Sequence, residues 1–192
     1  MLGFNKGGRM IEDPIEFTAE VEIDRDAALV FPLIDVADPQ FRHSQSGAKV
    51  QPVAGTTDRF EMTVEGLDTV FHYHVAERIE DTRYSLEATM NPQLFALVKS
   101  VETYEIEPRA EGACMVRLTT LATFDAELSD DEVANEVAMM SMAVTGELEK
   151  LKTLAEDGIE ALNAMEAAEM EFDIDLDLSE LDIEWDDIEP KQ

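Results

Sequence analysis

One alternating strand opens this chain and one long amphipathic helix comes late in it, and this order limits the folds that the chain can adopt. Residues 16–23 read EFTAEVEI, in which apolar and polar side chains alternate. A period of two is typical of an antiparallel strand with one buried face. The face that we expect to be buried carries Phe17, Ala19, Val21 and Ile23.

The late helix begins with Ser129-Asp130-Asp131-Glu132, which matches a capping box and places acids at the positive end of the helix dipole. Its apolar side chains recur at helical spacing. They predict one buried stripe made of Val133, Val137, Met140, Val144, Leu148, Leu151 and Ala155. A curved sheet wrapped around such a helix leaves a gap, and a gap lined by apolar side chains is a ligand pocket.

The segments between these two elements are mostly strands. Residues 27–34 are apolar and predict a short helix, which Pro32 limits to a couple of turns. Alternation recurs from residue 48 onward, and we expect about seven strands in all. Within residues 97–107 either register turns a charged side chain inward, so the face assignment of that strand stays open.

Acidic residues outnumber basic ones by 44 to 14, which gives a net charge of −30. Nucleic acids and anionic membrane surfaces are polyanions, so this charge argues against both as partners. No stretch approaches the roughly 18 uninterrupted apolar residues of a membrane span. The single Cys114 excludes an internal disulfide framework, and we therefore expect a cytoplasmic location.

Three parts of the chain differ in composition. We predict an N-terminal arm over residues 1–13, one folded domain over 14–165 and an acidic tail over 166–192. The tail alternates acids with large apolar side chains and holds the only tryptophan, Trp185. Such alternation is typical of segments that stay mobile until they fold onto a basic protein partner. The alternative is a strand, which the like charges on one face disfavour.

The opening run EFTAEVEIDRDAALVFPLID, in which a strand passes through an acid-rich turn into a helix, and the late helix together resemble the Bet v 1-like helix-grip superfamily. This superfamily includes the START domains and the polyketide cyclase/dehydrase and coenzyme Q-binding groups. The resemblance covers roughly residues 14–163. It implies an α+β helix-grip fold: a curved antiparallel sheet of about seven strands around a long C-terminal helix, with short helices after the first strand.

The same resemblance implies a pocket but no particular reaction. Members of the superfamily bind lipids, sterols, polyketides or quinones, act as cyclases, or regulate chaperones, and they share no universal catalytic motif. A fold of this kind therefore suggests what sort of molecule is bound without saying what is done to it.

His72 and His74 are the first candidates for chemistry. In a strand they point to the same face about 7 Å apart, which is a known metal-binding arrangement. A third ligand could come from His43 or from an acid. The alternative, which we prefer, is that both stand on the outer face of the sheet, solvated or paired with a carboxylate, and we predict no metal.

Other reactive residue types favour packing roles. Cys114 alternates with apolar neighbours and is interpreted as a small buried side chain. Arg117 is expected on the outer face. Tyr73, Tyr84 and Tyr104 could orient a ligand, but packing with a hydrogen-bonded hydroxyl is the preferred interpretation. The sequence has no Ser/His/Asp set, Gly-rich phosphate loop or CxxC pattern, so we predict no catalytic residue and no cofactor.

Our leading prediction is therefore binding or carriage of a small hydrophobic molecule, such as a lipid, a quinone or a polyketide-like compound. The residues that we expect to line the cavity are Phe60, Met62, Val64, Phe71, Tyr73, Tyr84, Leu86, Val116, Leu118, Val137, Met140 and Val144. We expect Phe17, Val21 and Phe124 to face inward as well.

Two alternatives remain open. One is an enzyme of the cyclase/dehydrase kind acting on an aromatic or polyketide substrate, with Tyr73, Tyr84 or His72 transferring protons. The other is a regulatory module that uses the acidic tail to bind a protein. The sequence leaves the oligomeric state open.

Overall fold

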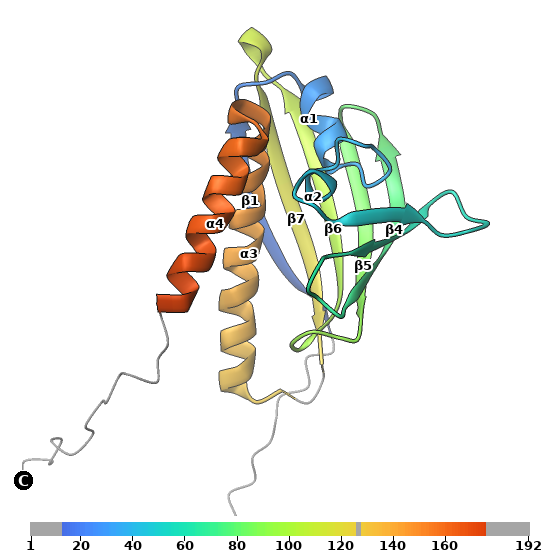
Figure 1. Cartoon of the computed structure of the whole chain (residues 1–192), viewed down its shortest axis with the longest axis vertical. Helices are drawn as coiled ribbons and strands as arrows, with labels where there is room; N and C mark the ends of the chain where they lie inside the picture. The colour runs from blue at the N-terminus through green and yellow to red at the C-terminus, as the bar shows by residue number, and fades with distance from the viewer. Residues whose placement is uncertain (1–12, 126–127, 176–192) are drawn as a thin grey trace, which may run out of the picture.

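A computed structural model describes residues 13–125 and 128–175, and its centre is one seven-stranded sheet (Figure 1). The strands are β1 Ile15–Ile23, β2 Lys49–Pro52, β3 Arg59–Thr63, β4 Val70–Ile79, β5 Arg83–Asn91, β6 Leu97–Pro108 and β7 Cys114–Phe124. The helices are α1 Ala27–Ile34, α2 Arg42–Gln45, α3 Asp130–Asp157 and α4 Ile159–Asp175, with a 3₁₀ turn at Ala110–Gly112.

Every neighbouring pair of strands in the sheet is antiparallel, in the order β1-β7-β6-β5-β4-β3-β2. The chain leaves β1 through α1 and α2, starts again at the far edge with β2, and returns strand by strand until β7 pairs with β1. The α+β fold, the seven-stranded antiparallel sheet, the C-terminal helix and the short helices after the first strand are confirmed.

The capping box predicted at the start of α3 is present. The Ser129 hydroxyl accepts a hydrogen bond from the Glu132 amide, and the Glu132 carboxylate accepts one from the Ser129 amide at 2.8 Å. These bonds satisfy donors that the first helical turn would otherwise leave unpaired. The helix then packs along β1 and β7 and ends at Asp157 (Figure 1).

Gly158 separates α3 from a second helix. Its φ of 87° lies in the left-handed region that favours glycine, and the chain reverses there so that α4 lies alongside α3 (Figure 1). Helix α4 runs to Asp175, so residues 166–175 of the predicted tail are helical. The rest of the tail, including Trp185, lies outside the described residues. Within the described ranges, no helix is long and apolar enough to span a membrane.

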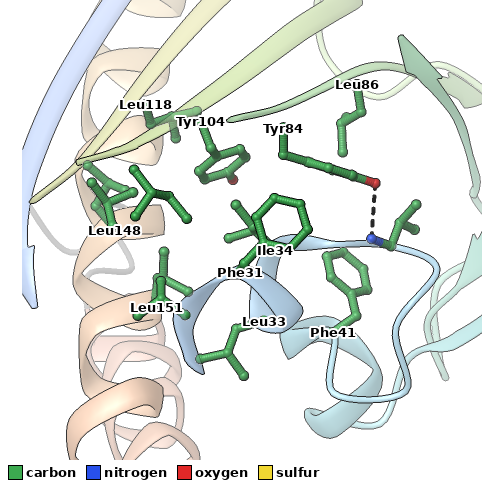
Figure 2. Packing of buried hydrophobic residues seen from close by; sticks show 14 of the residues in the cluster. Phe31, Leu33, Ile34, Phe41, Tyr84, Leu86, Tyr104, Leu118, Leu148 and Leu151 are labelled. Carbon is green, nitrogen blue, oxygen red and sulfur yellow. Dashed lines mark hydrogen bonds between the residues drawn. The ribbon is translucent and has the colours of Figure 1, made fainter. Parts of the chain in front are cut away.

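Helix α1 is short, as Pro32 predicts, and it packs between α3 and the sheet. Figure 2 shows Phe31 and Ile34 of α1 between Leu148 of α3 and Tyr84 of β5. The Tyr84 ring meets Phe31 edge to face, and its hydroxyl accepts a hydrogen bond of 3.1 Å from the Val36 amide (Figure 2). This bond ties the end of α1 to the middle of the sheet.

Most residues predicted to face inward are buried, because the β1–β7 and β3–β4 registers align their alternating faces. The buried ones are Phe17, Phe60, Met62, Tyr73, Leu86, Val116, Leu118, Phe124 and Val144, and the half-buried ones are Val21, Phe71, Val137 and Met140. Val64 is a wrong prediction: it lies beyond the end of β3 and is 38% exposed. Its carbonyl accepts from the Leu67 amide, so the chain has already entered the turn.

Candidate functional site

One carboxylate lies on the inner face of the sheet, Glu102 of β6. The pairing of β6 with β7 shifts by one residue between Leu97 and Lys99, so side chains before and after the shift alternate in different registers. Beyond it Glu102 shares the inner face with the buried Tyr104, and it stands between Leu86 on one side and Thr120 on the other. The sequence predicts that one charged side chain of residues 97–107 faces inward, and in the structure this side chain is Glu102.

Two further charged residues meet beside Glu102. Arg42 of α2 forms an ion pair with Glu147 of α3, and their side chains are only 6% and 21% exposed. The Tyr104 hydroxyl donates to Oε1 of the same Glu147 carboxylate at 3.1 Å. Arg42 Nη2 also lies 2.7 Å from His43 Nε2. Side chains from β6, α2 and α3 thus form one interior polar cluster.

Two cavities border this cluster. The larger, about 80 Å³, lies between α3 and β7 and is lined by Glu102, Leu118, Thr120, Met140, Ala143, Val144 and Glu147. The smaller, about 20 Å³, has room for roughly one water molecule. It is lined by Ile34, Phe41, Arg42, His43, Tyr73, Leu86, Glu102, Tyr104 and Glu147. Glu102 and Glu147 border both cavities, so each of these two carboxylates forms part of both walls.

Burial decides the protonation of the cluster. It raises the pKa of Glu102, and the nearby Arg42 charge and the hydrogen bond donated by the Ser100 hydroxyl offset this rise only in part. Burial also lowers the pKa of His43 well below 6.5, and the charges of Arg42 and Lys150 lower it further. The pKa values of Tyr73 and Tyr104 are raised by burial. The cluster therefore offers neutral hydroxyl and imidazole groups around one guanidinium, which stays protonated in proteins.

Glu102 should make the protein less stable as the pH rises. Its contribution to stability is fully present below the unfolded pKa of about 4.3 and is lost as the pH rises through the higher folded pKa. We therefore expect Glu102→Gln to stabilise the protein, relative to the natural chain, more at pH 7 than at pH 4. Urea unfolding at both values measures this difference, with the exposed Glu65→Gln as the control. An equal difference at both pH values would mean that the folded state does not perturb Glu102.

The structure distributes the predicted cavity residues unevenly. Leu118, Met140 and Val144 line the larger cavity, and Tyr73 and Leu86 line the smaller one. The others are buried or half-buried elsewhere in the interior, namely Phe60, Met62, Phe71, Tyr84, Val116 and Val137, while Val64 is at the surface. The three residues that bring charge to the site, Arg42, Glu102 and Glu147, were absent from the predicted set.

His72 and His74 lie on the outer face of the sheet, away from the cluster. His72 Nδ1 is 3.6 Å from a Glu61 carboxylate oxygen, and His74 Nε2 is 3.2 Å from one of Asp58. Among the described residues, no three His, Cys, Asp or Glu side chains come together so that they could hold a metal ion. Both histidines are therefore half-exposed residues whose rings lie next to carboxylates.

Cys114 and Arg117 take the positions expected of them. Cys114 is fully buried, and burial raises the pKa of its thiol to about 11, which keeps it unreactive at neutral pH. Arg117 is exposed on the outer face of β7 and pairs with Glu20 of β1.

Two larger hollows lie at the surface. One, of about 370 Å³, is bordered by Phe95 and the first turns of α3, and the other, of about 340 Å³, lies on the outer face beside His72 and His74. Both are lined largely by exposed or half-exposed side chains. Neither contains a buried polar cluster like the one between the sheet and α3, which we therefore take as the candidate site.

Comparison with known proteins identifies the family and supports the fold. The model of a protein family described as polyketide cyclase / dehydrase and lipid transport matches residues 14–156. The match begins one residue before β1 and includes the sheet, α1, α2 and nearly all of α3, so it contains every residue of the cluster. No curated protein matches the chain.

Several solved structures share the fold. The di-domain ARO/CYC protein BexL from the BE-7585A biosynthetic pathway aligns with a TM-score of 0.57 at 17% identity, over 76% of this chain and 46% of that one. Aha1 from Colwellia psychrerythraea, solved as a dimer, aligns with a TM-score of 0.55 at 12% identity, over 75% and 98%. MLL2253 from Mesorhizobium loti aligns at 0.54 and 17% identity, over 73% and 96%. At these identities the likeness establishes the fold alone.

Proposed function

This chain belongs to the polyketide cyclase/dehydrase and lipid transport family, and on that premise we propose that it binds a small, mainly apolar organic molecule between its sheet and α3. The observation that supports this most is the interior polar cluster of Arg42, Glu102, Tyr104 and Glu147, bordered by cavities with apolar walls. Ligand pockets typically combine apolar walls with a few placed polar groups that orient the ligand.

The energetics of the cluster favour a functional role. Removing charges from water costs several kcal/mol per ion, and an apolar replacement of a buried ion pair is often neutral or stabilising. Stability alone therefore does not require an arginine and two acids at this position. A bound lipid, quinone or polyketide-like molecule would explain these residues, because each of them could hydrogen-bond to a polar group of the ligand.

The ligand must enlarge the interior when it binds. A cavity of about 80 Å³ is well below the ~300–1,000 Å³ of typical ligand sites. Met140 lines this cavity and is half-buried, and methionine is unbranched and adapts its shape readily. We propose that the ligand enters beside Met140, between α3 and β7, and displaces its side chain.

Filling this cavity should therefore block binding. We expect Met140→Trp to weaken binding of the neutral dye Nile red at least about tenfold, while Met140→Ala binds as well as the natural protein or better. Dye fluorescence titration measures both. Ala143→Leu, which fills the same cavity from the next turn, provides a second variant if Met140→Trp fails to fold.

The matched control is Met142→Trp, because Met142 lies on the same helix but is 75% exposed. Its dye affinity should equal that of the natural protein. Unchanged affinity in both Met140→Trp and Ala143→Leu would place the dye elsewhere, for example in the surface hollow beside Phe95, and would remove the support for this site.

A second candidate function is favoured by the raised pKa of Glu102, which is a property of many general acids. Glu102 and Tyr104 could transfer protons to a polyketide or aromatic substrate in a reaction of the cyclase/dehydrase kind. His72 stands on the outer face, and the Tyr84 hydroxyl is bonded to the Val36 amide, so among the residues first considered only Tyr73 lies beside the cluster. Turnover that Glu102→Gln abolishes while ligand binding persists would favour this candidate.

The third possibility, a basic protein partner for the acidic tail, stays a prediction. The segment 176–192 lies outside the described residues, and the described part of the tail is the end of α4.

A further inference from the structure

We propose that Arg42 and Tyr104 form a cradle for the carboxylate of an apolar acid, and that Glu147 occupies this cradle until such a ligand displaces it. The inference rests on the proposed function and adds the chemical class of the ligand's polar group. It follows from the donor set, the charge balance of the cluster and the position of Glu147 on α3.

The donor set is that of a carboxylate site. Oxygen Oε1 of Glu147 receives the Arg42 guanidinium and the Tyr104 hydroxyl, the latter at 3.1 Å. A guanidinium pairs with carboxylates through charge-assisted hydrogen bonds, which are shorter and stronger than neutral ones. Arg42 comes from α2 and Tyr104 from β6, so the two donors stay in place when a group on α3 moves.

Charge balance makes Glu147 the counter-ion of Arg42. Burial raises the pKa of Glu102 and so favours its neutral form. His43 lies 2.7 Å from Arg42, and its lowered pKa favours the neutral ring. Of the groups that contact Arg42, Glu147 is therefore the one that balances its positive charge. A second anion added beside Glu147 would be repelled, whereas an exchange of one carboxylate for another leaves the net charge of the cluster unchanged.

Glu147 is also placed to leave. Its side chain is 21% exposed, against 6% for Arg42, so its carboxylate can reach water by a change of rotamer. The space beside it is the larger cavity, whose walls include Leu118, Met140 and Val144. A ligand carboxylate in the cradle would direct its hydrocarbon body along these apolar side chains.

The test compares an acid with its neutral counterpart. Octanoate and 1-octanol are titrated by calorimetry into the full-length natural protein and into Glu147→Gln. We expect Glu147→Gln to bind octanoate at least about tenfold more tightly than the natural protein, because the internal competitor is gone. Its affinity for 1-octanol should change less than about twofold. The control Glu149→Gln makes the same change of charge at an exposed position of α3 and should leave both affinities unchanged.

Removing a donor should have the opposite effect. Tyr104→Phe in the Glu147→Gln background keeps the buried ring and is expected to lower octanoate affinity about threefold or more without a matching loss for 1-octanol. If 1-octanol binds but Glu147→Gln does not strengthen octanoate binding, the cradle is overturned while the proposed function stands. If neither compound binds any variant, the proposed function fails and the cradle with it.

Discussion

Replacing Arg42 with methionine is expected to lower the free energy of unfolding by about 3 kcal/mol, at the low end of the range for breaking a buried ion pair. The change leaves Glu147 charged and unpaired beside Tyr104 and Glu102. The low end applies because Glu147 is 21% exposed and can recover some hydration. Urea unfolding at pH 7 measures the loss.

The double variant Arg42→Met with Glu147→Leu supplies the decisive comparison. Because it removes both charges and replaces them with apolar side chains, we expect its stability to return to within about 1 kcal/mol of the natural protein or to exceed it. The same variant should bind octanoate no better than 1-octanol. A double variant as unstable as Arg42→Met alone would show that the cluster is required for folding, and this would weaken the functional interpretation.

Replacing Leu151 with alanine should cost still more, about 3–5 kcal/mol. Leu151 is fully buried on α3, and Figure 2 shows it on the side of this helix that faces α1. The truncation removes the apolar surface that joins α3 to α1 and leaves a cavity that rigid neighbours cannot close. Thermal and urea unfolding both report the loss.

Met142→Ala is the matched control on the same helix, since its side chain is 75% exposed and its truncation should change stability by less than about 0.5 kcal/mol. A loss below about 1 kcal/mol for Leu151→Ala would mean that α3 is not held against α1 and the sheet. The cavities beside the polar cluster would then have no fixed wall.

The parts of the fold that could be predicted depend on local signals. The alternation of residues 16–23 specified the buried face of β1, and the capping box at Ser129 specified the start of α3. Both patterns arise from neighbours within a few positions of each other, so no knowledge of distant contacts was needed. The turn that exposes Val64 was missed because the alternation itself continues past the last paired residue, Thr63.

The charged site could not be predicted in the same way. Glu102 gave a partial signal, because one charge had to face inward within residues 97–107, but the register shift that selects it depends on β7. Glu147 lies next to Leu148 of the apolar stripe and resembles an ordinary residue at the edge of such a stripe. Arg42 belongs to a helix of only four residues, which has no clear sequence pattern. Its ion-pair partner, Glu147, comes next to it only through the packing of α3 on the rest of the domain.

The pairing of β1 with β7 has a consequence for how the chain reaches its native state. Thr18 and Thr119 face each other across this pair and are 101 residues apart in sequence. Contacts between residues so far apart in sequence raise the contact order and slow folding, because the entropy of closing a long loop is lost before the contacts can stabilise the chain. During synthesis β1 emerges first and has no partner until β7 has left the ribosome. Its apolar face must meanwhile stay protected from aggregation, which makes the acids on its other face useful before the protein is finished.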